Sequence, residues 1–198
     1  KYDGGLGKSW NLCIQQTSSR PYFNFRHSGG GNRTVFADTQ INFDEWYHIA
    51  GSWDGTNLNV YVNGVLENSQ DESGGEINSS SSNIIIGASG EGTSGFLHGM
   101  VDEVVIWETA LSEEEMQSYM SQELSGQEQG LAGYWNFNEG DGPELTDMVG
   151  NGYQGLINGA SWSGDGAPVE PPSYGCTDSY AGNYDPDAGA DDGSCSDY

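Results

Sequence analysis

Apolar and polar residues alternate with a period of two through much of the first hundred positions. The clearest case is Leu58, Val60 and Val62, which alternate with asparagine and tyrosine. This pattern makes one face of the pleat aliphatic and the other polar, as in an antiparallel strand that is covered on one side. The following Asn63-Gly64 pair predicts a tight hairpin turn, because both residues tolerate a positive φ.

Further short strands are predicted wherever aromatic and β-branched residues stand between clusters of Gly, Ser and Asn. They cover residues 10–15, 22–26, 34–38, 46–53, 83–87, 96–107 and 131–137, with one or two more within 153–162. Their spacing is typical of β-sandwiches. We therefore expect an all-β fold.

One segment predicts a helix. Ser112 is followed three residues later by Glu115, which is the sequence pattern of a capping box, and acidic residues fill the first turn. Met116 and Tyr119 then continue at helical spacing. We expect a short amphipathic helix that packs on the sandwich.

Charge is distributed unevenly along the 198-residue chain. The formal net charge is −25, from five Lys and Arg against 30 Asp and Glu. All five basic residues lie in residues 1–33, which contain one acidic residue and so carry +4, whereas residues 34–198 carry −29. The excess repels nucleic acid and anionic membranes, so neither is an expected partner. It favours surroundings rich in salt and calcium, although a merely acidic soluble surface is an alternative.

The three cysteines predict one disulfide and one free thiol. Cys176 and Cys195 enclose a Gly- and Asp-rich tail with little apolar content, which favours a disulfide and hence secretion to an extracellular or cell-surface location. Cys13 lies in an apolar run and is expected to be a buried free thiol rather than a catalytic or intermolecular one. No apolar run approaches ~18 residues, so membrane insertion is not expected.

Four segments, taken in order, resemble a laminin G-like domain of the concanavalin A-like lectin and glucanase superfamily. They are residues 45–64, 84–87, 96–107 and 111–115. The resemblance implies a jelly-roll sandwich of two antiparallel sheets that binds sugars or other surface ligands, commonly with calcium.

Residues 131–162 depart from that pattern, because they resemble the segment with which such domains begin. An N-terminal stretch is therefore missing, or the sandwich is permuted, or residues 131–162 complete a neighbouring copy. The last alternative predicts pairing between chains through exposed strand edges and thus a homo-oligomer. We expect the sandwich at residues 1–163, a Pro-rich linker at 164–174 and a separate tail at 175–198.

The tail resembles a short acidic Cys-bounded repeat of the thrombospondin type 3 kind. Calcium prefers oxygen ligands from carboxylates and amides on loops. The proposed ligands are Asp178, Asn183, Asp185, Asp187, Asp191 and Asp192. A disordered acidic tail is the alternative. The spacing is not that of an EF-hand.

A second group of oxygen-bearing side chains could hold calcium within the sandwich. It consists of Asp102 (or its neighbour Glu103), Glu139, Asp147 and Asn151. The resemblance implies structural calcium near such positions. Aspartate and asparagine in turns are, however, more often engaged in local backbone hydrogen bonds.

Polar and aromatic residues near the first predicted strands are the best candidates for ligand binding, because the tryptophans lie in apolar runs and are expected to pack in the core. The ligand-binding candidates are Tyr22, Asn24, Arg26, His27, Asn32 and Arg33. The basic residues among them could instead contact an acidic neighbouring chain.

Enzymatic activity is not expected. Catalytic members of the superfamily usually carry Glu-x-Asp-x-(x)-Glu on one strand, and Asp102, Glu103 and Glu108 do not reproduce that spacing. The sequence predicts a secreted, non-catalytic, calcium-dependent module that binds a glycan or surface polysaccharide, as part of a larger surface protein. The main alternative is a structural subunit of an extracellular filament or adhesin joined by strand exchange, and an enzyme accessory module is a third.

Overall fold

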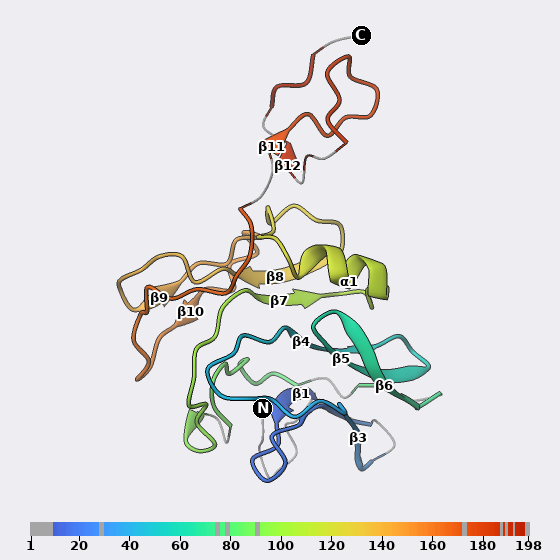
Figure 1. Ribbon diagram of the computed structural model, residues 1–198, viewed down its shortest axis with the longest axis vertical. Helices are drawn as coiled ribbons and strands as arrows, with labels where there is room; N and C mark the ends of the chain where they lie inside the picture. Colours follow the sequence, from blue (N-terminus) through green and yellow to red (C-terminus); the bar gives the residue numbers. More distant parts are fainter. Residues whose placement is uncertain are drawn as a thin grey trace. The chain divides into compact units, whose positions relative to one another are not determined.

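The structure is a computed structural model that describes residues 10–27, 30–73, 76–77, 80–89, 92–171, 174–186, 188, 190–191 and 193–196. The described strands are β1 (Trp10–Ile14), β2 (Pro21–Arg26), β3 (Asn32–Phe36), β4 (Ile49–Trp53), β5 (Asn57–Val62), β6 (Val65–Asp71), β7 (Val104–Trp107), β8 (Leu131–Trp135), β9 (Glu144–Leu145), β10 (Gly155–Leu156), β11 (Tyr174–Gly175) and β12 (Ala190–Asp191), and the helix is α1 (Glu113–Tyr119) (Figure 1).

The chain divides into two compact units, which are considered separately. Unit 1 comprises residues 1–100 and 110–117, and unit 2 comprises residues 101–109 and 118–198. The fold is mostly β, built from antiparallel sheets, with one short helix among the described residues. The predicted jelly-roll class is thereby confirmed.

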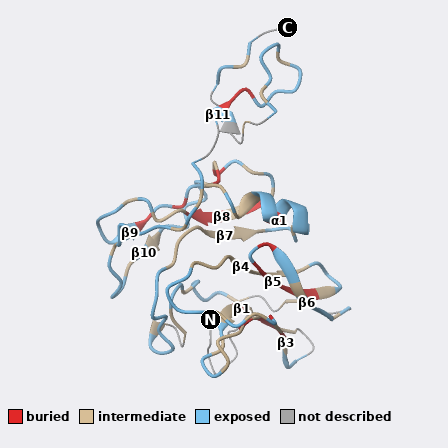
Figure 2. Cartoon of the chain, viewed as in Figure 1, coloured by how far each residue is buried: buried red, intermediate tan, exposed pale blue. Residues whose placement is uncertain are grey.

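Unit 1 contains two three-stranded antiparallel sheets, β1–β2–β3 and β4–β5–β6, seen as two layers in Figure 1. The sheets pack face to face, because β5 contacts both β2 and β3. Period-two alternation supplies the core: Phe23 and Phe25 of β2 pack with Leu58 and Val60 of β5, all of them buried. Buried stretches of the chain are red in Figure 2. The aliphatic face predicted from the sequence is therefore the face that the second layer covers.

The hairpin between β5 and β6 forms at the predicted turn. Asn63 and Gly64 have φ values of 49° and 74°, and Val62 pairs with Val65. Positive φ at both central positions gives a turn whose twist matches that of the flanking strands. Asn63 also accepts a hydrogen bond from the backbone N–H of His48 at 3.0 Å, which ties the turn to the residue just before the start of β4.

The helix α1 begins with the predicted capping box. The Glu115 N–H donates to the Ser112 hydroxyl at 3.2 Å, and the Ser112 N–H donates to the Glu115 carboxylate at 2.8 Å. These reciprocal bonds satisfy backbone donors that the first helical turn leaves free. They also hold the pKa of Glu115 below its usual value.

Unit 2 is built around the antiparallel pair β7–β8. Its core contains Leu124, Leu131 and the fully buried Tyr134, with Trp107 packed against them. The rings of Trp107 and Tyr119 stack with centroids 5.0 Å apart. Residues 131–162, which resemble the opening of the domain, thus contribute a strand that pairs with β7 within the same chain.

Two strand predictions are wrong. The described residues 83–87 form no strand, and within the predicted strand 96–107 only β7 is extended and paired. Gly87 and Glu103 have φ values of 76° and 52°, which interrupt the extended backbone that a strand needs. Several apolar side chains of these segments are consequently exposed, Phe96 by 61%.

The C-terminal tail is closed by the predicted disulfide. Cys176 and Cys195 are bonded with their Cα atoms 4.8 Å apart, and the two-residue strands β11 and β12 pair in parallel beside the bond. Cys13 in β1 is a free thiol, as predicted, but it is half-buried and not fully buried. In the described part of the chain, no helix has the length and apolar character needed to span a membrane.

The Pro-rich segment before the tail is hydrogen-bonded to the rest of unit 2. The Ala167 N–H donates to the Asp102 carboxylate at 2.7 Å, and Glu170 exchanges backbone hydrogen bonds with Ser121 and Glu123 at 3.0 and 2.8 Å. Residues 167–170 are therefore held in place. The expected boundaries at residues 163 and 174 remain predictions.

Candidate functional site

One face of the sheet β1–β2–β3 carries most of the predicted ligand-binding residues; we call it the polar face. Side chains of a strand alternate between faces, and directly paired residues of neighbouring strands share a face. Because Phe23 and Phe25 point into the core, the residues that alternate with them along β2 lie on the opposite side. The polar face consists of Asn11 and Cys13 of β1, Tyr22, Asn24 and Arg26 of β2, and Asn32, Thr34 and Phe36 of β3.

The polar face changes in character along β2. At one end the rings of Tyr22 and Phe36 lie side by side with centroids 5.3 Å apart. In the middle, the Asn11 amide donates to the Asn24 carbonyl at 2.8 Å. Both asparagines are buried, so they hold the strands together and are not open to a ligand.

The far end of the polar face is more open. Arg26 is half-buried and pairs directly with Asn32, which is exposed at the start of β3. Exposed Gly31 precedes Asn32 in the connecting loop. The accessible groups on this face are therefore the Tyr22 ring, the Asn32 amide and the Arg26 guanidinium. Tyr22 and Arg26 are about 13 Å apart along β2.

Two predicted ligand-binding residues do not lie on the polar face. His27 follows Phe25 on the core side, where it forms a β-bridge with Ile77 and stacks on the Phe25 ring at 6.4 Å. Arg33 pairs with Phe25 across the strands, and its Nε donates to the Glu72 carboxylate at 2.6 Å. Alternation alone separates these residues from Tyr22, Asn24 and Arg26.

The sequence reasoning omitted Asn11 and Thr34, which the register places beside Asn24. The signal for Asn11 was present, because it stands between apolar Trp10 and Leu12 in an alternating strand. A buried polar residue in that position needs a partner across the sheet, and Asn24 supplies it.

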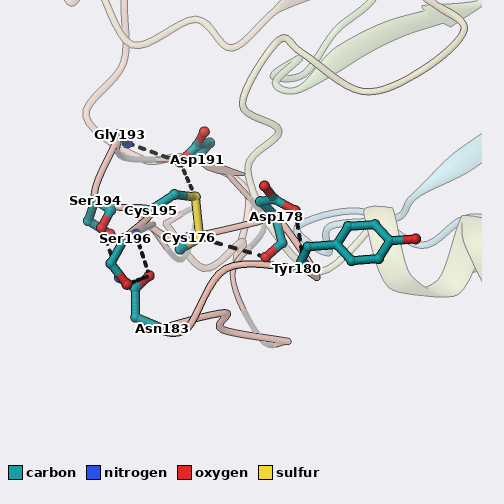
Figure 3. The surroundings of a disulfide bond; sticks show 9 residues. All are labelled: Cys176, Asp178, Tyr180, Asn183, Asp191, Gly193, Ser194, Cys195 and Ser196. Atoms are coloured by element: carbon teal, nitrogen blue, oxygen red, sulfur yellow. Dashed lines mark hydrogen bonds between the residues drawn. A yellow bond between two sulfur atoms is a disulfide. The ribbon is translucent and has the colours of Figure 1, made fainter. Parts of the chain in front are cut away.

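The predicted calcium ligands of the tail are engaged in local hydrogen bonds (Figure 3). Asp178 accepts from the Tyr180 N–H at 2.9 Å, and Asp191 from the Gly193 N–H at 3.0 Å. The Asn183 side chain accepts from Ser196 and donates to the Ser194 carbonyl at 2.8 Å.

Asp185 lies in the same loop, while Asp187 and Asp192 lie outside the described residues. Within the described ranges, no group of three or more His, Cys, Asp or Glu side chains is placed to hold a metal ion. Calcium binding by the tail stays a prediction.

The second predicted calcium group is likewise occupied by backbone donors. Buried Asp147 accepts hydrogen bonds from the N–H groups of Tyr153 and Val149, each at 3.2 Å. Asn151 donates to the Ala132 carbonyl at 3.1 Å, and Glu139 accepts from the Thr146 N–H at 2.6 Å. Asp102 accepts from the N–H groups of Glu103 and Ala167. These bonds shape the loops around β8. Calcium binding by this second group stays a prediction.

The acidic residue with the largest pKa change is Glu103, next to β7. Burial raises its pKa to about 7, and the nearby negative charges of Asp102 and Glu123 add to the rise. A hydrogen bond from the Tyr134 hydroxyl at 2.6 Å acts in the opposite direction. The same hydroxyl accepts from the Leu124 N–H at 3.3 Å, so Glu103 is joined to the core of unit 2.

Comparisons with known proteins place this geometry in context. Residues 2–117 match the family described as the concanavalin A-like lectin/glucanases superfamily. A candidate carbohydrate-binding protein from Bacteroides ovatus ATCC 8483 has a similar fold, with a TM-score of 0.57 and 20% sequence identity. That match covers 80% of this chain and 51% of the other, so this chain spans about half the length of that protein.

A second solved structure is similar over a smaller part of the chain. It is residues 221–444 of an S-layer domain-containing protein from Clostridium thermocellum ATCC 27405, with 20% identity and a TM-score of 0.35. The match covers 61% of this chain and 66% of the other. No curated protein matches the chain.

Proposed function

Because the chain belongs to the concanavalin A-like lectin/glucanases superfamily, we propose that it is a non-catalytic module that binds carbohydrate through the polar face of β1–β2–β3. The observation that carries the proposal is the open end of that face, where Arg26 and exposed Asn32 pair directly. Guanidinium and amide groups can hydrogen-bond sugar hydroxyls, and the Tyr22 ring supplies an apolar surface about 13 Å away along β2. The description of the Bacteroides ovatus protein agrees with this proposal.

A non-catalytic role is favoured because no paired carboxylates occupy the polar face. Glycosidases need two carboxyl groups on either side of the scissile bond. Glu103, the carboxyl group whose pKa is raised, accepts a hydrogen bond from the Tyr134 hydroxyl in the core of unit 2 and does not belong to the polar face. We therefore expect bound oligosaccharides to be recovered intact.

Binding can be tested on a glycan array with purified protein and two variants. The double variant Arg26→Ala and Asn32→Ala removes the open end of the polar face and should lose at least about tenfold in affinity, the effect of losing two hydrogen bonds of ordinary strength. The matched control is Gln16→Ala, in the exposed turn between β1 and β2. Equal binding by all three proteins, or no bound glycan, would contradict the proposal.

Calcium binding by the tail is a separate proposal. Its support is the placement of five aspartates between Cys176 and Cys195 in a chain of net charge −25, since such groups repel one another unless a cation neutralises them. A cation bound by the folded state alone raises the melting temperature. We expect calcium to do so more than magnesium at equal ionic strength, and Asp185→Asn to reduce the effect.

The control for that measurement is Asp165→Asn, which removes one exposed carboxylate before the tail. Identical melting curves in calcium and in excess chelator would show that the tail needs no calcium. The disulfide supports a further part of the proposal, namely that the protein works in an oxidising, extracellular setting.

A structural subunit joined to its copies by strand exchange is the second candidate function. The observation in its favour is the exposure of Ile84, Ile86, Phe96 and Leu97, which lie in two segments that the sequence predicts to be strand-forming. Sedimentation velocity over a range of concentrations tests it. A concentration-independent monomer would leave carbohydrate binding as the sole proposal.

A further inference from the structure

We propose that Arg26 recognises the carboxylate of an acidic sugar unit, so that the polar face selects uronic-acid-type glycans over neutral ones. This inference rests on the proposed carbohydrate-binding function and deepens it. It names the class of sugar that the open end of the face would take.

The first observation is that Arg26 differs from the two other described arginines. Arg20 pairs with Asp38 at 2.8 Å, and Arg33 pairs with Glu72 at 2.6 Å. In the residues that the structure describes, no carboxylate pairs with Arg26. A half-buried guanidinium has lost part of its hydration, so an anion beside it has less water to displace.

The second observation is the surroundings of Arg26 on the polar face. Asn32 lies directly across the strand pair, and Asn24 lies two residues along β2. Neither side chain carries a charge that would neutralise the guanidinium. Asn24 is already bonded to Asn11, which leaves Arg26 and Asn32 as the accessible pair.

The chemistry of the guanidinium decides the ligand class. Arginine donates two parallel N–H groups to a carboxylate, and such charge-assisted bonds are roughly twice as strong as bonds between neutral groups. A sugar hydroxyl can accept a hydrogen bond from one of these N–H groups, but its single oxygen cannot accept both in the parallel geometry that a carboxylate allows. The neighbouring Asn32 amide would then bond a hydroxyl of the same sugar ring.

The net charge limits the size of the ligand. With −25 on the whole chain, a long polyanion is repelled, whereas one carboxylate seated on Arg26 interacts within the screening distance of about 8 Å at physiological salt. The inference is therefore for an oligosaccharide with an acidic unit at the contact point, and it remains consistent with the exclusion of nucleic acid.

The test uses a panel of uronate-containing oligosaccharides together with the same oligosaccharides after each carboxylate has been reduced to a primary alcohol. We expect the intact protein to bind the acidic members at least about tenfold more tightly than their neutral counterparts. Arg26→Gln should abolish this ratio, and Arg26→Lys, which keeps the charge but loses the fork, should restore part of it. The matched control Arg20→Gln changes the net charge equally and should preserve the ratio.

The outcomes separate this inference from the function on which it rests. Equal or tighter binding of the neutral members, lost in the Asn32→Ala variant, overturns the selectivity for acidic sugars and leaves carbohydrate binding intact. A ratio that survives in Arg26→Gln assigns the selectivity to another residue and overturns the role of Arg26. No binding by any glycan on the panel or the array overturns the proposed function itself.

Discussion

Glu103 stores a proton in the folded protein that the unfolded chain would release. Its pKa is raised from 4.5 to about 7 by burial first and by Asp102 and Glu123 second. The folded state therefore binds more protons than the unfolded state between these values, and stability falls as the pH rises from about 5 to 8. After allowance for solvent screening of a half-buried group, we expect a loss of about 1–2 kcal/mol in the free energy of unfolding.

Urea denaturation at pH 5 and pH 8 measures this loss. Glu103→Gln should remove it, because the amide stays neutral and its carbonyl can still accept from the Tyr134 hydroxyl. Glu108→Gln is the control, since Glu108 is exposed and directly follows β7. If both variants show the same pH dependence as the unmodified protein, Glu103 does not hold the proton.

At the scale of single residues, the sequence predicts the chemistry of a side chain better than its partners. The polar and aromatic residue types singled out Tyr22 and Arg26, and the register then shows that they share one face while Arg33 lies on the other. For Asp147 the sequence left two roles open, because an aspartate in a turn looks alike whether it binds N–H groups or a cation. The folded loops show the backbone donors, the N–H groups of Val149 and Tyr153.

Strand β4 owes its close approach to β2 to one glycine. A Cβ added at Gly51 would lie 2.2 Å from Cγ of Phe23, well inside contact distance. Gly51→Ala must therefore shift the Phe23 ring or separate the sheets, and we expect it to destabilise unit 1 by about 1–3 kcal/mol, as overpacking does. Urea denaturation followed by tryptophan fluorescence measures the change.

Gly99→Ala is the matched control for that substitution, because a Cβ there has no heavy atom within 4 Å and the backbone φ is ordinary. The control should unfold with the midpoint of the unmodified protein. A Gly51→Ala midpoint equal to that of the control would mean that the two sheets pack less closely at this point.

Elements governed by local rules were predictable, whereas elements governed by distant pairing were not. The Asn63-Gly64 turn and the capping box at Ser112 depend on a few adjacent residues, and both form as predicted. Residues 83–87 have the composition of a strand but are not paired as one in the described fold, where a single backbone bond from the Leu97 N–H to the Gly87 carbonyl at 2.8 Å is seen. Strand propensity measures how well side chains fit a half-buried pleat, so without a partner strand it has little effect.

For the whole molecule, the large negative charge can be read directly from the sequence, whereas the contacts between residues show little of it. Five Lys and Arg stand against 30 Asp and Glu, so they can pair with only a minority of the acidic residues; among the described residues, Arg20 and Arg33 form ion pairs. The mutual repulsion of the acidic residues opposes the compact state. Mobile cations weaken this repulsion, and they weaken it more at higher salt, where the screening length is shorter.

This argument makes a prediction about salt. Raising NaCl from 10 to 150 mM shortens the screening length from about 30 to about 8 Å, so the melting temperature should rise even in excess chelator. A change from about 150 mM to 1 M should add less, because little long-range repulsion then remains. A melting temperature that stays flat or falls with salt in excess chelator would show that repulsion among the acidic groups does not limit the stability of the fold.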